Sequence, residues 1–137
     1  MLLVSACLLG ENCKYTGGNN RDEAVLAFLE GKEYIPFCPE QAGGLPTPRL
    51  PSEIRGDRVV NSGGEDVTDA FCQGAARALE TCRAHSVDMA ILKEGSPSCG
   101  VHLVYDGTFN RRKREGMGMT AMRLHQAGIA VMSENDI

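Results

Sequence analysis

The chain has 137 residues, a net charge of −4 at pH 7 and a hydrophobic fraction of 42%. This length corresponds to one domain over residues 1–137, and the mildly acidic balance argues against a general nucleic-acid-binding protein. No apolar run approaches the roughly 18 residues of a membrane-spanning helix, and the N-terminus lacks the positive segment of a secretory signal, so we expect a cytoplasmic protein without membrane contact.

The first half of the chain alternates between short apolar segments and an amphipathic one. Its pattern predicts a strand over residues 1–6, a helix over residues 22–30 and a strand over residues 33–37. Residues 38–51 contain four prolines and two glycines, which argues against both a helix and a central strand. Residues 54–61 are expected to form a small hairpin or an edge strand.

The second half contains the longest predicted helix, over residues 69–85. Apolar side chains recur there at the 3.6-residue helical period: Phe71, Cys72, Ala75, Ala76, Leu79 and Cys82. The elements expected after it are a strand over 88–92, an extended segment over 101–108, a polar and basic segment over 110–118, a helix over 120–127 and a strand over 129–132.

Strands that alternate with helices predict an α/β fold, here a single three-layer Rossmann-like domain with a mostly parallel sheet. Three cysteines are placed by this sheet: Cys7 and Cys38 directly follow the first two strands, and Cys99 lies seven residues after the third. Ligands of such sheets bind beyond the carboxyl ends of the strands, where loops from different strands meet. We therefore expect these three thiols to converge on one site.

Three converging thiols leave three interpretations open: a [4Fe-4S] cluster with one iron not ligated by the protein, a catalytic zinc, or a thiol nucleophile. A zinc site would need a further ligand, and His102 is the one plausible nitrogen donor. Cys13 could be a ligand, a redox partner of Cys7 or a half-buried thiol. Cys72 and Cys82 lie on the apolar stripe of the long helix, so we expect them in the core.

Motifs along the whole chain match one known family: S-A-C-L-L-G at residues 5–10, C-K-Y-x-G at 13–17, C-P-E-x-x-G-G-L-x-x-P-R at 38–49, L-K-x-x-S-P-S-C-G at 92–100, G-x-G-M-T-A at 116–121 and G-I-x-V at 128–131. On these motifs the chain resembles the thiouracil desulfidase family of bacteria. Longer members of that family carry a second domain that this chain lacks, which argues against action on whole tRNA.

The resemblance implies a cofactor and a reaction. Family members bind an oxygen-sensitive [4Fe-4S] cluster through only three cysteines, which by motif are Cys7, Cys38 and Cys99. The iron without a protein ligand binds the sulfur of a thiolated pyrimidine, and water replaces that sulfur at the ring carbon. The implied substrate is thiolated uracil or its nucleotide, and the implied products are uracil or UMP and hydrogen sulfide.

The resemblance also points to a glutamate and a serine near the cluster. By motif the glutamate is Glu40, and the serine is either Ser96 or Ser98. Glu40 lies two residues after Cys38, where its carboxylate could deprotonate water or carry a proton. A serine hydroxyl there could donate a hydrogen bond to the base or to the attacking water.

Charged and glycine residues near these motifs are candidates for contact with the substrate. The candidates for substrate or phosphate contact are Arg49, Lys93, Arg111, Arg112, Gly116 and Gly118. Arg49 and Lys93 could instead offset the negative charge of the three thiolates. Two further functions stay open at this point: a tRNA thiouridine desulfidase that binds RNA through the basic segment, and a metal- or cluster-binding module without catalysis.

Overall fold

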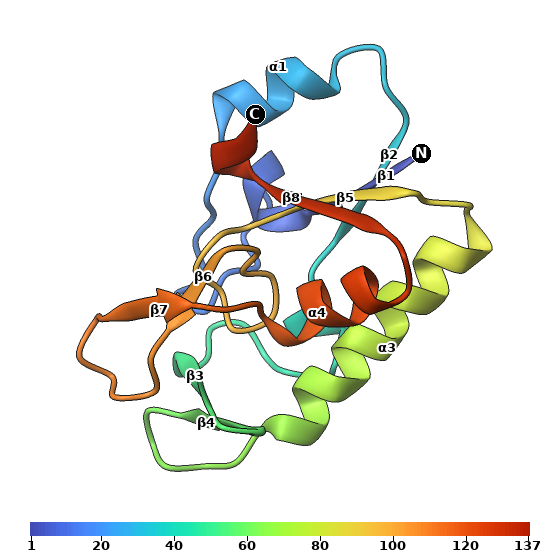
Figure 1. The fold of residues 1–137 in the computed structure, drawn as a ribbon. Helices are drawn as coiled ribbons and strands as arrows, with labels where there is room; N and C mark the ends of the chain where they lie inside the picture. Colours follow the sequence, from blue (N-terminus) through green and yellow to red (C-terminus); the bar gives the residue numbers. More distant parts are fainter.

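A four-stranded parallel sheet forms the centre of the computed structural model, which describes residues 1–137 (Figure 1). Its strands are β1 (Leu2–Ser5), β2 (Tyr34–Phe37), β5 (Met89–Leu92) and β8 (Ala130–Ser133). The strand order is β2-β1-β5-β8, and every neighbouring pair is parallel. The expectation of a mostly parallel sheet is confirmed, and the carboxyl ends of all four strands lie at one edge.

Helices cover both faces of this sheet (Figure 1). α1 (Glu23–Leu29) lies on one face, and α3 (Thr68–Ala84) and α4 (Met119–Gln126) pack against each other on the opposite face. The predicted three-layer α/β architecture is therefore confirmed. None of these helices has the length and apolar character needed to cross a lipid bilayer.

The alternation of side chains along β1 builds one core on each face of the sheet. Leu2 and Val4 pack on the α1 side together with Val25. Leu3 points to the opposite face and joins the larger core under α3 and α4, which includes Leu124. Successive side chains of a strand point in opposite directions, so a fully apolar strand is what a sheet covered on both faces requires.

Three single helical turns were not expected from the sequence. They are η1 (Ala6–Leu9), α2 (Pro39–Ala42) and η2 (Glu134–Asp136). The first of them directly follows β1. The expectation that residues 38–51 contain no helix is wrong at α2. Pro39 stands at the first position of this turn, where a helix does not use the backbone N–H that proline lacks.

Two antiparallel hairpins lie outside the central sheet. The first pairs β3 (Ser52–Arg55) with β4 (Arg58–Asn61) and confirms the predicted hairpin, although it begins two residues earlier. The second pairs β6 (Leu103–Tyr105) with β7 (Lys113–Glu115). β7 falls in the segment expected to be a polar loop. All three of its residues are exposed, so its strand is held by backbone pairing and shows no alternation of apolar and polar side chains.

The two cysteines of α3 have different environments. Cys82 is buried in the core as expected, with 1% of its surface exposed. Cys72 is exposed, so the expectation that it lies in the core is wrong. Its neighbour Phe71 takes the buried position of that turn, and one residue along a helix rotates the next side chain by about 100° away from the core.

α2 and α3 approach each other through two glycines. A Cβ atom on Gly74 of α3 would overlap the carbonyl group of Pro39, and a Cβ atom on Gly43 would overlap the carbonyl group of Ala70. Only glycine permits this backbone contact. The contact fixes α2, and with it the side chain of Glu40, against the longest helix of the fold.

Candidate functional site

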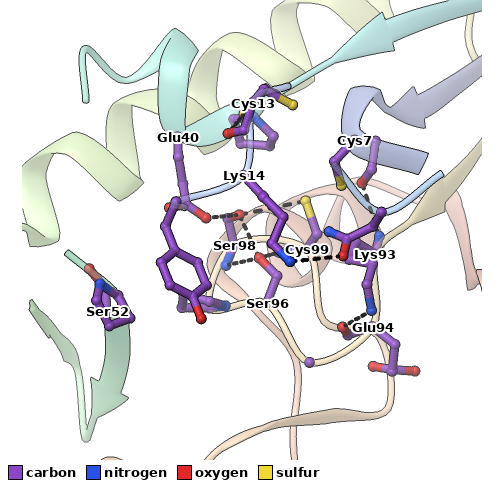
Figure 2. A pocket seen from close by; sticks show the side chains of 18 of the residues that line it. Cys7, Cys13, Lys14, Glu40, Ser52, Lys93, Glu94, Ser96, Ser98 and Cys99 are labelled. Atoms are coloured by element: carbon purple, nitrogen blue, oxygen red, sulfur yellow. Dashed lines mark hydrogen bonds between the residues drawn. The ribbon is translucent and has the colours of Figure 1, made fainter. Parts of the chain in front are cut away.

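A cavity of about 540 Å³ opens at the carboxyl edge of the central sheet. Four of the six cysteines line it: Cys7, Cys13, Cys38 and Cys99. They come from three loops, after β1, β2 and β5, and Figure 2 shows Cys7 and Cys99 reaching the cavity from different loops. The structure therefore brings the three predicted thiols to one site and adds Cys13 as a fourth.

The first two thiols are held by short helical turns at strand ends. Cys7 lies on η1, and its carbonyl oxygen accepts hydrogen bonds from the N–H groups of Gly10 (3.2 Å) and Asn20 (2.9 Å). Cys38 is the residue that precedes α2, and its carbonyl oxygen accepts the N–H of Ala42 at 2.9 Å. These bonds fix the backbone of both cysteines directly after their strands.

The loop that carries Cys99 is organised by Ser96. The Ser96 Oγ accepts hydrogen bonds from the backbone N–H groups of Ser98 and Cys99, both at 3.1 Å. Such a side-chain turn satisfies backbone groups that the tight loop would leave without partners. Ser96 therefore has a structural role beside any chemical one.

The same loop supplies the cap of α4. The carbonyl oxygens of Pro97 and Ser98 accept the N–H groups of Met119 (2.9 Å) and Thr120 (2.8 Å). The first N–H groups of a helix have no partner within the helix, so this contact stabilises both the helix and the loop. A Cβ atom on Gly118 would lie 2.6 Å from the Ser98 carbonyl oxygen, which explains the glycine before this helix.

Glu94 holds the far side of the Cys99 loop. Its Oε1 accepts the N–H groups of Val101 (2.8 Å), His102 (2.9 Å) and Leu103 (3.0 Å), and the residue is only 7% exposed. Burial raises the pKa of Glu94, but hydrogen bonds from these N–H groups and that of Gly95 outweigh this effect, and the pKa lies below its ordinary value. This carboxylate is a fixed structural anion.

Glu40 also lines the cavity, but its hydrogen-bond partners are side chains rather than backbone N–H groups. Its Oε1 accepts a hydrogen bond from the Arg49 Nε at 3.0 Å, and its Oε2 accepts one from the Ser98 hydroxyl at 3.2 Å. The hydroxyls of Ser98 and Ser96 are 3.0 Å apart. Figure 2 shows the resulting chain of hydrogen bonds from Ser96 through Ser98 to Glu40.

The burial of the two serines differs. Ser98 is 1% exposed, whereas Ser96 is partly exposed at the cavity wall. Ser96 is therefore the hydroxyl that a molecule in the cavity can reach, and Ser98 connects it to the carboxylate. The Ser98 hydroxyl also lies 3.5 Å from the Cys99 sulfur.

Cys13 lines the cavity together with Cys7 and Cys38 and changes the pKa of both. The hydrogen bond with Cys13 lowers the pKa of Cys7 to about 7 and that of Cys38 to about 6. The pKa of Cys13 itself is raised because it hydrogen-bonds to Cys38 and Cys7 and is buried. Cys7 and Cys38 therefore have thiolate character near neutral pH, and Cys13 keeps its proton.

Cys99 differs from the other pocket thiols. Burial raises the pKa of Cys99 to about 12, against hydrogen bonds with Ser5 and Ser98 that act in the opposite direction. A metal centre supplies the positive charge that ionises such a buried thiol, because coordination to a metal removes the proton.

The donor set fits an iron–sulfur cluster. Thiolates are the ligands that hold these clusters, one to each iron, and four thiols line this cavity. No group of three or more His, Cys, Asp or Glu side chains is arranged around a single metal ion. His102, the nitrogen ligand considered for zinc, lies outside the cavity, where its Nε2 is 2.8 Å from Asp136 Oδ2.

The structure places only some of the remaining candidates at the cavity. Arg49, Lys93 and Arg111 line it, whereas Arg112 does not. The Lys93 ammonium lies 2.7 Å from Glu134 Oε2 and donates to the Glu94 carbonyl oxygen at 2.9 Å.

Gly116 and Gly118 also lie outside the cavity lining. The Gly116 N–H donates to the His102 carbonyl oxygen at 3.1 Å, and the Gly118 N–H donates to the Gly100 carbonyl oxygen at 2.8 Å. Both N–H groups are therefore occupied within the protein rather than turned toward an anion.

Two residues of this site were not assigned a role from the sequence. Glu94 lies in the motif that contains Cys99, but its partners are backbone groups seven to nine residues further along, which no side-chain pattern announces. Lys14 lines the cavity and donates to Asn20 Oδ1 at 3.4 Å. The only sequence feature that pointed to Lys14 was its place in the C-K-Y-x-G motif at residues 13–17.

Comparison with known proteins identifies close relatives over the whole chain. A family model described as 2-thiouracil desulfurase matches residues 2–136. The uncharacterized protein YbbK of Bacillus subtilis (strain 168) is 41% identical over 147 aligned positions, which cover 100% of this chain and 97% of that protein. A solved structure of the [4Fe-4S]-dependent thiouracil desulfidase TudS is 45% identical, with a TM-score of 0.94 over 99% of this chain and 91% of that one.

Proposed function

The chain belongs to the 2-thiouracil desulfurase family, and on this basis we propose that it removes sulfur from thiolated uracil or from its nucleotide with a [4Fe-4S] cluster bound in the cavity. The observation that carries the proposal is the meeting of four thiols with the Glu40 carboxylate and the hydroxyls of Ser96 and Ser98 in one cavity. The similar structure of TudS, a [4Fe-4S]-dependent thiouracil desulfidase, supports the same cofactor. This assignment is favoured over a non-catalytic module and over an enzyme that acts on tRNA.

The proposed ligands of the cluster are Cys7, Cys38 and Cys99. Three protein ligands would leave one iron of the cluster free to act as a Lewis acid toward the soft sulfur of the substrate. Cys13 lowers the pKa of Cys7 and of Cys38, which supports their thiolate form before the cofactor is bound.

We assign to Glu40 the role of the base. The reaction exchanges sulfur for oxygen: a C=S group and water give a C=O group and hydrogen sulfide. Water must lose a proton as it attacks the ring carbon, and a carboxylate at the cavity can accept that proton. Glu40 Oε2 has a hydroxyl partner, Ser98, so it can take up a proton while Oε1 keeps its hydrogen bond from Arg49.

The two serines provide the path between the cavity and this base. Ser98 donates to Glu40 Oε2, and Ser96 is 3.0 Å from Ser98. The two hydroxyls therefore link the cavity wall to Glu40, and a proton released by water at the cavity can reach the carboxylate through Ser98. Ser96, which is partly exposed, is the proposed contact to water or substrate, and Ser98 is the link.

The lining of the cavity favours a nucleotide over a free base. About 540 Å³ lies in the lower half of the range of small-molecule pockets, roughly 300–1,000 Å³, and the proposed cluster occupies part of it. Lys14 and Arg111 line it together with the aromatic rings of Tyr105 and Phe109. These groups can pack against a ribose and attract a phosphate, so the nucleotide is the preferred form of the substrate.

The experiment that tests this function uses anaerobically purified protein. We expect it to be brown, with a broad absorbance at about 400 nm from thiolate-bound iron, and to release sulfide from 2- or 4-thiouracil or from the corresponding monophosphates. Iron and sulfide analysis of the same sample gives the cluster content. A colourless protein with stoichiometric zinc and no sulfide release would overturn the proposal.

A further inference from the structure

Arg49 is bound in the wall of the cavity by four hydrogen bonds. Its Nε donates to Glu40 Oε1 at 3.0 Å, and one terminal nitrogen donates to the Pro46 carbonyl oxygen (3.1 Å) and the Thr47 hydroxyl (2.9 Å). The other terminal nitrogen donates to the Cys13 carbonyl oxygen at 2.9 Å. Only 7% of the side chain is exposed, and each of its three nitrogens has a partner within the protein.

These contacts connect two of the three loops of the site. The Cys13 carbonyl belongs to the loop after β1, and Glu40 belongs to the turn after β2. The Cys38 sulfur lies 3.8 Å from the same Cys13 carbonyl oxygen. The guanidinium therefore sets the position of the Glu40 carboxylate relative to the loop of Cys13 and to the neighbouring thiol.

The contact with Oε1 also orients the carboxylate. Because Arg49 occupies Oε1, the other oxygen, Oε2, is the one presented to Ser98. A lysine cannot replace this arrangement, because its ammonium is a single point of charge and lacks the planar fork that reaches three directions at once.

We propose that Arg49 is a positioning residue for Glu40, which holds the carboxylate with Oε2 toward the serines, and that it does not contact the substrate. This inference rests on the proposed function, since it needs Glu40 to act as the base. It assigns to Arg49 an effect on the rate of the reaction rather than on the affinity for the substrate.

A double-mutant cycle on the anaerobic, cluster-containing protein tests this proposal. The four proteins are the wild type, Arg49→Lys, Glu40→Gln and the double variant, with Arg77→Lys as the control. Arg77 also donates to this turn, to the Ala42 carbonyl oxygen at 2.6 Å, but it is exposed and lies outside the cavity lining. Absorbance at about 400 nm and thermal unfolding report cluster content and folding of each protein.

We expect Arg49→Lys to lower kcat by about 10- to 100-fold, the cost of displacing a reacting group by about 1 Å, with KM changed by less than about threefold. Arg77→Lys should keep the wild-type kcat. If Arg49 acts through Glu40, Arg49→Lys changes kcat by less than about threefold in the Glu40→Gln background, because coupled residues are not additive.

Several results would overturn the proposal. Equal effects of Arg49→Lys in both backgrounds would show that it acts independently of Glu40, and a rise in KM alone would show a substrate contact. Loss of the cluster or of the fold in Arg49→Lys would assign the residue to the scaffold instead. Failure of the proposed function is seen separately, since wild-type protein would then release no sulfide or Glu40→Gln would keep full activity, and the inference would fall with it.

Discussion

Glu40 and Glu94 line the same cavity, and each belongs to a loop that carries a cysteine, but their oxygens have different partners. Glu94 Oε1 accepts three backbone N–H groups within 3.0 Å. Glu40 has one ion pair, with Arg49, and one hydroxyl, that of Ser98. Three backbone N–H groups hold the first carboxylate in a rigid loop, whereas the second has one side-chain partner on each oxygen, and one of these is a hydroxyl that can pass a proton to it.

This difference separates a structural anion from a chemical base. Protonation of Glu94 would weaken the loop that carries Cys99, so the fold keeps it ionised. Protonation of Glu40 on Oε2 removes the negative charge of its ion pair but keeps the hydrogen bond from Arg49 to Oε1, and it reverses the direction of the hydrogen bond with Ser98. The predictions below test this division, from the largest expected effect to the smallest.

Loss of the proposed cluster is the largest expected effect. Replacing Cys7, Cys38 or Cys99 by alanine should abolish cluster retention, because three thiolates leave no spare ligand. Cys82→Ala, a buried cysteine of the core, is the matched control and should keep the cluster. Iron and sulfide analysis of anaerobic protein is the measurement; retention of the cluster in Cys99→Ala with its loss in Cys82→Ala would refute the ligand assignment.

Breaking the link between Glu40 and the cavity should slow the reaction at an unchanged cluster content. Ser98→Ala removes the hydroxyl that joins Ser96 to Glu40. We expect kcat for sulfide release to fall by about 10- to 100-fold, less than the roughly 10²–10⁴-fold of a general acid–base group, because the carboxylate itself remains. Ser62→Ala, an exposed serine of a turn, serves as the control. A wild-type rate in Ser98→Ala would remove this serine from the proton path.

Ser96 combines both roles, so its replacement distinguishes them. Ser96→Ala should lower kcat and also reduce the free energy of unfolding by about 1–2 kcal/mol, because two N–H groups of the Cys99 loop lose their acceptor. Denaturant unfolding of Ser96→Ala and Ser98→Ala measures the difference. Equal stability of the two variants would contradict the structural role of Ser96.

Glu94→Ala should act on stability rather than on the chemistry. Three backbone N–H groups lose a charged acceptor, and we expect the free energy of unfolding to fall by about 2–4 kcal/mol. Glu65→Ala, an exposed glutamate, should change it by less than about 0.5 kcal/mol. A Glu94→Ala protein with wild-type stability and no sulfide release would reverse the assignment of the two carboxylates.

The smallest effect is the acid dependence that Glu94 adds to stability. Its pKa lies below the ordinary value of 4.5, so its contribution is fully present above that pH and is lost as the pH falls through the folded-state pKa. The stability difference between wild type and Glu94→Gln should therefore shrink below about pH 4.5. Denaturant midpoints measured between pH 3 and 7 test this, and a difference that grows in acid would contradict it.

The sequence predicted the parts of the site that parallel strands bring together. Cys7 and Cys38 follow strand ends directly, and the rule that such ends share one edge is enough to place them at one cavity. Single turns could not be predicted in the same way. α2 has too few residues to show a helical period, and the exposed β7 has no alternation. Both were expected to be loops.

The hydrogen bonds of the site were even harder to predict from the sequence. The role of Glu94 depends on backbone N–H groups whose direction is set by the turn after Cys99, and the ion pair of Glu40 joins residues nine positions apart. Cys72 was expected in the core, but its neighbour Phe71 points into the core at that turn of α3, and Cys72 points away from it. Small rotations of this kind decide contacts without leaving a pattern in the sequence.

The rate of sulfide release by Glu40→Gln, measured at a cluster content equal to that of the wild type, tests the central claim most directly. The amide keeps the shape of the side chain but cannot accept the proton of water. We expect a normal absorbance spectrum, unchanged binding of the thiolated substrate and a rate at least about 100-fold below that of the wild type. A wild-type rate in Glu40→Gln would show that Glu40 is not the base and would contradict its division of roles with Glu94.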